Sequence, residues 1–282
     1  MGAYGWKATI GCIVPPRTNE TVIHEAVRLA PDGVSLCWSV LGLPEFGQYQ
    51  FDEALGRAVV AAKELADRDV DIIVFMGIPL QTSKGPGYHE RLEQELAAAI
   101  DHKKPVTTDI HCVLGALRAL ELNRIVISSI YQRYIQDNLI RYFEHYGVRT
   151  LADEGLSYAL ADCMTKPTME TAYEAAMSAH RKAPEAEGML ISCPQWPVIG
   201  NIERLERDTG KPVVAQLAAV QVWANARADQ AGAVAAYRRA LALGGNAPLP
   251  DLYAAAGARF QFDETTLGAA VQLIETTLEQ LQ

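Results

Sequence analysis

Residues 71–79 read DIIVFMGIP, an acidic residue followed by an apolar, β-branched run and a turn. Residues 187–194, EGMLISCP, repeat this pattern and carry a cysteine where the first copy has a glycine. A Lys-Pro-Val tripeptide also recurs in the same order, at residues 104–106 and 211–213. Two patterns that recur in one order predict a duplication, with halves at about residues 5–115 and 116–227. The alternative is chance, because charged, apolar and turn segments recur in any α/β protein.

Short apolar runs alternate along the chain with segments whose apolar residues recur every three or four positions. The predicted strands are residues 8–14, 34–40, 71–76, 105–108, 124–130, 188–192 and 212–215. The predicted helices are residues 52–66, 89–100, 113–120, 135–146, 169–182 and 199–207. Such alternation is typical of parallel sheets with both faces covered by helices. We therefore expect an α/β fold of two pseudo-symmetric, flavodoxin-like halves, residues 1–115 and 116–227.

The last part of the chain, residues 228–282, has no strand pattern. Residues 244–250, GGNAPLP, predict a loop. A final helix is expected after Asp263, because apolar residues from Leu267 to Leu281 fall on one face. We expect a helical C-terminal extension that packs on the core or on a second subunit, with a lid as the alternative.

The charge balance argues against a nucleic-acid partner. The 282 residues contain 25 Lys+Arg and 34 Asp+Glu, a net charge of -9, and the basic residues are scattered. No apolar run approaches the roughly 18 residues of a membrane span, and no leader precedes the first strand, so we expect a cytoplasmic protein without a membrane partner. A homodimer or higher homo-oligomer is the general expectation for such a protein.

The five cysteines form no CxxC pair, so neither a disulfide framework nor a metal site is expected. Cys12, Cys37, Cys112 and Cys163 lie in or beside apolar segments, and we expect them to be packing residues. Cys193 differs because it ends a predicted strand. In open parallel sheets, ligands bind outside the carboxyl ends of the strands, so Cys193 is expected to face Gly77 across one central cleft.

Several motifs together resemble a known superfamily. They are Gly11-Cys12-Ile13-Val14-Pro15-Pro16, Phe75-Met76-Gly77, Thr107-Thr108, Ala116-Leu117-Arg118-Ala119-Leu120, Tyr131 and Leu190-Ile191-Ser192-Cys193. In this order they resemble the aspartate/glutamate racemase superfamily, in its branch of maleate isomerases and arylmalonate decarboxylases. The resemblance runs from Ala8 to Trp223 and does not include the C-terminal extension.

The resemblance implies an activity and a site. Members use two opposed cysteines without a metal or organic cofactor, and this chain has Gly77 in the place of the first. One cysteine is the pattern of the arylmalonate decarboxylases, which release carbon dioxide from a malonate and protonate the enediolate with the second thiol. The resemblance thus implies a decarboxylase of a small dicarboxylic acid, with Cys193 as proton donor and Tyr131 beside the carboxylate. The substrate pocket is expected to include Pro15, Pro16, Asn19, Gly77, Ile78 and Pro194.

Elementary chemistry agrees with that assignment. A carbanion beside a carboxylate is tolerable only as an enediolate whose oxygens meet fixed donors. A thiol with an ordinary pKa of about 8.5 stays protonated at neutral pH, which suits a general acid. Cationic loop residues, Arg17 and Lys84, are weaker candidates for a second carboxylate because such side chains are usually solvated.

Three residues depart from the decarboxylase pattern. Ile78 and Pro79 stand where the decarboxylases have hydroxyl residues, and Pro194 stands where they have glycine. These changes remove two hydroxyls and two backbone N–H donors. Replacement donors are expected from Gln81, Thr82 or Gln195, or from a shifted backbone.

Two alternatives stay open. A maleate-type isomerase or racemase would use Asn19 to bind a carboxylate, but it lacks a thiol at residue 77 to add to the alkene. A binding protein for small carboxylates would keep the cleft and lose the chemistry, which the changes at Ile78, Pro79 and Pro194 favour.

Overall fold

The structure is a computed structural model that describes residues 4–30 and 33–216. The predicted helical extension of residues 228–282, with its loop at 244–250 and its final helix, lies outside the described residues. The expected limits of the halves at residues 115 and 227 stay predictions.

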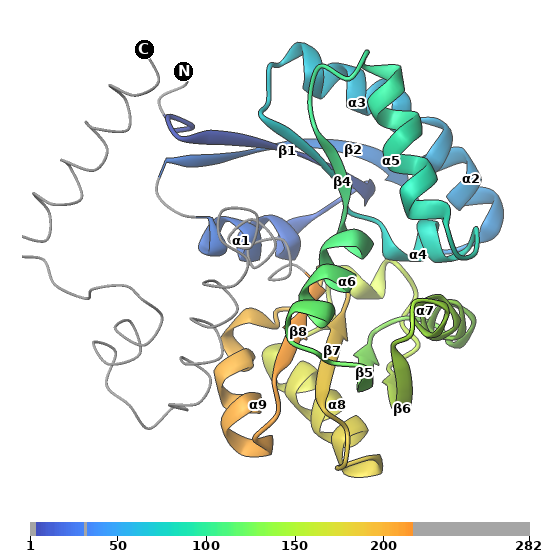
Figure 1. The fold of residues 1–282 in the computed structure, drawn as a ribbon, viewed down its shortest axis with the longest axis vertical. Coiled ribbons are helices and arrows are strands. Elements are labelled where there is room, and N and C mark those ends of the chain that lie inside the picture. Colours follow the sequence, from blue (N-terminus) through green and yellow to red (C-terminus); the bar gives the residue numbers. More distant parts are fainter. Residues whose placement is uncertain (1–3, 31–32, 217–282) are drawn as a thin grey trace, which may run out of the picture.

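The first half consists of a parallel sheet and its helices (Figure 1). Its elements are β1 (Ala8–Pro16), α1 (Glu20–Leu29), β2 (Val34–Leu43), α2 (Gln48–Gly56), α3 (Ala58–Asp67), β3 (Ile72–Phe75), α4 (Ile78–Thr82), α5 (Tyr88–Ala99), β4 (Val106–Thr108) and α6 (Asp109–Ala119). The strand order is β2-β1-β3-β4.

The second half repeats this plan. Its elements are β5 (Arg124–Ser129), α7 (Arg133–His145), β6 (Arg149–Gly155), the 3₁₀ turn η1 (Asp162–Met164), α8 (Met169–Lys182), β7 (Gly188–Ser192), the 3₁₀ turn η2 (Ile199–Asn201), α9 (Ile202–Thr209) and β8 (Val213–Ala215). The order β6-β5-β7-β8 matches that of the first sheet, strand for strand, and all pairs are parallel. The predicted fold of two pseudo-symmetric halves is confirmed.

The repeated acidic residue has the same structural role in both halves. Asp71 Oδ2 accepts a hydrogen bond from the Thr9 amide over 2.6 Å, at the start of β1. Glu187 Oε2 accepts from the amides of Asn123 and Arg124 over 2.8 and 2.9 Å, at the start of β5. In each half, the residue before the third strand therefore satisfies the first amides of the central strand.

The two halves are joined by α6. Its apolar residues pack against Ile125 and Ile127 of β5, Leu190 of β7 and Val214 of β8, although α6 follows a strand of the first sheet. Figure 1 shows α6 between the first sheet above and the second sheet below. The helix begins where Thr108 Oγ1 accepts from the His111 amide.

Some elements differ from the sequence prediction. The seven predicted strands are present, but β6, α1 and α4 were not predicted. β6 is an edge strand of sequence RTLADEG in which no residue is fully buried, so it has no apolar run. Residues 52–66 form part of two helices, α2 and α3, which meet at Arg57 after Gly56. The edge strand β2 is only partly buried, so the expectation that both faces of every strand are buried is wrong there.

Within residues 4–30 and 33–216, no helix is long and apolar enough to cross a membrane.

Candidate active site

A cavity of about 40 Å³ lies where β1, β3, β5 and β7 end, between the two halves. The structure brings together here all eight residues predicted for the site: Pro15, Pro16, Asn19, Gly77, Ile78, Tyr131, Cys193 and Pro194. Their roles in catalysis and binding stay predictions. The other described residues that line the cavity are Val14, Val22, Leu43, Phe46, Met76, Pro79, Leu80, Leu160, Cys163, Gln195 and Gln216.

Cys193 follows β7 in an unusual backbone conformation. Its φ angle is 121°, which residues other than glycine rarely adopt. Such a conformation costs on the order of 1–3 kcal/mol and persists only where surrounding contacts hold it. One of these contacts is a hydrogen bond of 2.9 Å from the Cys193 amide to Gln216 Oε1.

The thiol of Cys193 keeps its proton in the folded protein. Burial raises its pKa to about 12, although hydrogen bonds from the Gln195 amide and the Tyr131 hydroxyl act in the opposite direction. The thiol therefore stays protonated at neutral pH, and those two donors can stabilise the thiolate that a proton transfer leaves.

Tyr131 is buried beside this thiol. Its ring contacts Phe46 edge to face, with 6.1 Å between the centroids, and its amide donates to Ser129 Oγ over 3.1 Å. Burial raises the pKa of the phenol well above its ordinary value of 10.0. The hydroxyl is thus a hydrogen-bond donor throughout the neutral pH range.

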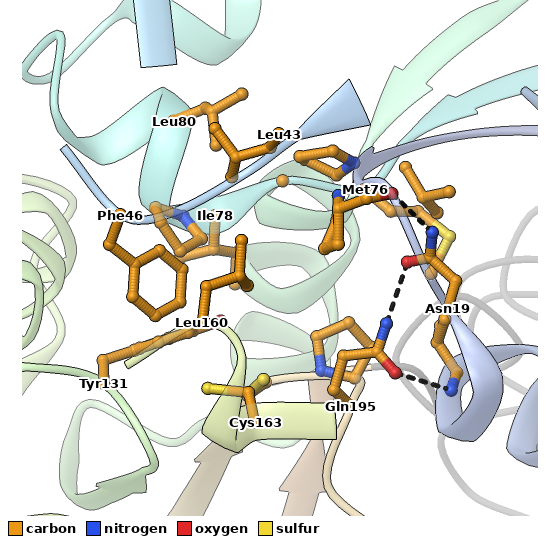
Figure 2. A pocket seen from close by; sticks show the side chains of 18 of the residues that line it. Asn19, Leu43, Phe46, Met76, Ile78, Leu80, Tyr131, Leu160, Cys163 and Gln195 are labelled. Atoms are coloured by element: carbon orange, nitrogen blue, oxygen red, sulfur yellow. Dashed lines mark hydrogen bonds between the residues drawn. The ribbon is translucent and has the colours of Figure 1, made fainter. Parts of the chain in front are cut away.

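Asn19 and Gln195 form a polar pair across the cleft. Gln195 Nε2 donates to Asn19 Oδ1 over 2.8 Å, and Gln195 Oε1 accepts from the Val22 amide over 3.3 Å. Asn19 Nδ2 donates to the Pro16 carbonyl over 2.6 Å. Figure 2 shows this pair on one side of the cavity, opposite Phe46, Tyr131 and Leu160. Each NH₂ group uses one of its two N–H bonds here, so each has a second N–H to offer a ligand.

Gly77 lines the same cavity as Cys193 and has no side chain. A Cβ at this position would lie 2.7 Å from the Phe75 ring and 2.9 Å from Pro15 Cγ, so a larger residue would displace one of them. As glycine, residue 77 contributes no acid or base to the cavity.

Two of the three expected replacement donors do not line the cavity. Gln81 Nε2 donates to Asp109 Oδ1 over 2.8 Å, and Thr82 Oγ1 donates to the Ile78 carbonyl over 2.9 Å, so both side chains are used inside the fold. Only Gln195 lies in the cavity. The sequence could not show this, because the short helix α4 that turns Gln81 and Thr82 away was not predicted.

The cavity is largely apolar, and its described lining includes no charged residue. Arg17 and Lys84 are not part of it, and Lys84 Nζ instead pairs with Asp52 Oδ1 over 2.8 Å. Within the described ranges, no cluster of three His, Cys, Asp or Glu side chains has a geometry that would hold a metal ion.

Cys163 was expected to be a packing residue, and it lines the same cavity as Cys193. Burial raises its pKa, with a further contribution from the charge of Cys193. It lies in η1, after β6, and Figure 2 shows it between Tyr131 and Gln195. The duplication is the signal that could have found it, since Leu43 at the end of β2 and Phe46 in the segment after β2 also line the cavity.

Comparisons with known proteins agree on one family. The family model described as arylmalonate decarboxylase matches residues 10–241. The arylmalonate decarboxylase of Bordetella bronchiseptica is 27% identical over 206 residues, which cover 73% of this chain and 84% of that protein. The maleate isomerase of Geobacillus stearothermophilus is 21% identical over 169 residues, or 58% of this chain and 65% of its own.

Solved structures share the fold. A liganded double mutant of arylmalonate decarboxylase has a TM-score of 0.71 at 23% identity, covering 78% of this chain and 92% of its own. A maleate isomerase variant from Pseudomonas putida S16, solved with maleate, has a TM-score of 0.72 at 20% identity, covering 79% and 92%.

Proposed function

Because the chain belongs to the arylmalonate decarboxylase family, we propose that it removes carbon dioxide from a malonate-type dicarboxylic acid without a cofactor. The relatives are enzymes, and two of them are named for arylmalonate and maleate. The observation that carries the proposal is the buried thiol of Cys193 in a cavity where residue 77 is glycine and offers no second acid or base. One acid on one face suits protonation of an enediolate, whereas a racemase needs a second group on the other face.

The reaction balances with one proton. The bond between the α-carbon and one carboxyl group breaks, carbon dioxide leaves, and the electron pair forms an enediolate with the remaining carboxylate. Cys193 then gives its proton to the α-carbon, and the thiolate recovers a proton from solvent. The apolar wall of Leu43, Phe46, Leu80 and Leu160 suits a departing carboxylate, because loss of charge there avoids the cost of its desolvation.

The carboxylate that remains on the substrate needs hydrogen-bond donors. This site lacks some of the donors that the decarboxylase pattern implies. Tyr131 supplies a hydroxyl that burial keeps protonated. The second N–H bonds of Asn19 and Gln195 supply further donors, from opposite halves of the chain. Together they replace the donors missing at Ile78, Pro79 and Pro194.

The test follows a panel of acids by proton NMR in deuterated water. The panel contains phenylmalonate, an alkylmalonate, maleate and aspartate. We expect loss of carbon dioxide from a malonate, with one deuterium at the α-carbon. Cys193→Ala should abolish turnover, a loss of at least about 10²-fold, and keep substrate binding. Cys37→Ala is the matched control because Cys37 is only partly buried and does not line the cavity. Full activity in Cys193→Ala would overturn the proposal.

A maleate-type isomerase is the second candidate, and Cys163 is the observation that favours it. A thiolate that adds to the alkene forms a C–S bond, permits rotation and then leaves, with all carbon retained. Cys163 is a second thiol in the cavity that could take this step despite Gly77. Its raised pKa makes the thiolate scarce, which is why we rank this second. Isomerisation of maleate that disappears in Cys163→Ala would establish it.

A binding protein for small carboxylates is the alternative outside catalysis. Equal affinity of wild type and Cys193→Ala for a malonate, with no product from either, would support it. A cytoplasmic location and a homodimer or higher homo-oligomer stay predictions from the sequence.

A further inference from the structure

A buried carboxylate lies behind the cleft, and we propose that Asp109 is a positioning residue that acts through Gln216 to hold Cys193. Asp109 begins α6 and is fully buried, and Gln216 follows β8. The proposal deepens the proposed function and rests on it, because the residue held in place is the expected proton donor.

The contacts form a continuous series of hydrogen bonds from Asp109 through Gln216 to Cys193. Gln216 Nε2 donates to Asp109 Oδ2 over 2.6 Å. Gln216 Oε1 accepts from the Cys193 amide over 2.9 Å and from Ser192 Oγ over 3.2 Å. Asp109 and Gln216 each stand five residues after the Lys of the repeated Lys-Pro-Val, so the bond joins equivalent positions of the two halves.

Asp109 fixes which groups donate and which accept in this series of hydrogen bonds. An ionised carboxylate only accepts, so the Gln216 amide must turn its NH₂ group toward Asp109. Its carbonyl oxygen is then left to face the Cys193 N–H. The other carboxylate oxygen, Oδ1, accepts from the Ile110 amide over 2.9 Å and from Gln81 Nε2 over 2.8 Å. A backbone N–H cannot reverse its polarity, so Oδ1 must stay an acceptor.

This arrangement acts on the backbone that carries the thiol. Cys193 has a φ angle of 121°, a conformation that needs contacts to persist. The Gln216 oxygen meets the amide of Cys193 itself, and so fixes the peptide plane from which the side chain leaves. Without this acceptor we expect the residue to relax and the thiol to leave its position over the substrate.

Ionisation of Asp109 makes the arrangement sensitive to pH. Burial raises its pKa to about 7, against the hydrogen bonds that it accepts. The titratable side chains that interact with its charge are Cys112, on α6, and Tyr131, after β5. The other side chains that contact the Asp109 carboxylate are uncharged amides, Gln81 from α4 and Gln216 after β8. Protonation puts a donor on the carboxyl group and disturbs the chain, so kcat should fall as pH drops below about 7.

Asp109→Asn breaks this series of hydrogen bonds at the contact with Gln216. The Ile110 N–H keeps the oxygen of the introduced amide in place, so the introduced NH₂ group faces Gln216 Nε2, donor against donor. The Gln216 amide must then reverse and present its NH₂ group to the Cys193 N–H. We expect exchange of the Cys193 amide proton to become about tenfold faster. We also expect kcat for a malonate to fall about tenfold with little change in KM.

A double variant separates positioning from mere packing. Gln216→Glu alone places two carboxylates against each other. Combined with Asp109→Asn, however, the introduced carboxylate accepts from both the introduced amide and the Cys193 N–H, and every donor again meets an acceptor. Asp109→Asn/Gln216→Glu should therefore restore amide protection and kcat to within about threefold of wild type.

Gln81→Leu is the matched control. It removes the other amide that donates to Asp109 and does not touch Cys193, so exchange at Cys193, read above pH 8 where Asp109 is ionised, should stay within about twofold of wild type. Equal exchange in Asp109→Asn and wild type overturns the proposal, and so does a double variant that is unfolded or no better than the single variants. Amide exchange is read without substrate, so a wild type that turns over no malonate sinks the proposed function and leaves this test intact.

Discussion

At the scale of the residue, the site depends on one side chain that is present and one that is absent. Cys193 places a protonated thiol in an apolar cavity, and Gly77 lines the same cavity without a side chain. The order of the sequence motifs and the duplication predicted that these two residues would line one cleft. What the sequence could not show is the φ angle of 121° at Cys193, because no residue type other than glycine signals such a conformation.

Gly77→Ala should lower the free energy of unfolding. Its Cβ would lie within 3 Å of the Phe75 ring and of Pro15 Cγ, and neither is the free end of a flexible chain. We expect a loss of about 1–3 kcal/mol in urea denaturation. Gly56→Ala is the control, since its Cβ would meet nothing within 4 Å. Equal stability of the two variants would mean that Phe75 and Pro15 can shift at little cost in free energy.

Tyr131→Phe should reduce turnover and leave the fold intact. The change removes only the hydroxyl, which donates to the Cys193 thiol and which we propose also donates to the substrate carboxylate. Loss of one such donor typically lowers kcat by about 10²-fold. The control is Tyr134→Phe, because Tyr134 is 43% exposed. A kcat unchanged from wild type would remove Tyr131 from the mechanism.

At the scale of the element, the repeat explains both what sequence patterns predicted and what they missed. The strands β5 and β7 were predicted from their apolar runs, which reflect burial of both of their faces. β6 was missed because an edge strand needs no apolar run, and the following segment with Leu160 and Cys163 was then not assigned to the cavity. Gln195 was proposed as a donor on sequence grounds, but its pairing with Asn19 joins residues 176 positions apart.

The acidic residue before β7 should stabilise the start of β5. Glu187→Ala leaves the amides of Asn123 and Arg124 without their carboxylate acceptor. We expect a loss of about 1–2 kcal/mol in chemical denaturation, moderated by the access of water to this strand end. Glu185→Ala, at an exposed neighbouring position, should have no such effect. If both substitutions cost the same, the carboxylate does not support the strand.

At the scale of the whole molecule, the halves are bound together at the cleft by buried polar contacts. Asn19 meets Gln195, and Asp109 meets Gln216, each pair with one residue from either half. α6 adds apolar packing of the first half on the second sheet. The candidate active site and the junction of the halves are therefore the same region of the molecule.

Stability should depend on pH through Asp109. Its pKa rises from an ordinary 3.8 to about 7 in the folded protein, because burial disfavours the charge. The folded protein thus holds a proton that the unfolded chain releases, and this stabilisation is complete below pH 4 and lost as pH rises to about 7. The difference corresponds to roughly 4 kcal/mol at about 1.4 kcal/mol per pKa unit.

Denaturation of wild type and Asp109→Asn from pH 4 to pH 8 measures this dependence. The free energy of unfolding of wild type should fall with rising pH relative to that of the variant. Parallel curves would show that Asp109 keeps an ordinary pKa.

The central claim is that one thiol, on one face, protonates the carbanion left by decarboxylation. The most direct measurement is the product of a prochiral aryl methyl malonate in deuterated water, resolved by chiral chromatography and mass spectrometry. We predict one enantiomer in large excess, with a single deuterium at the α-carbon, formed by wild type and not by Cys193→Ala. A racemic product, or the same product from Cys193→Ala, would contradict it.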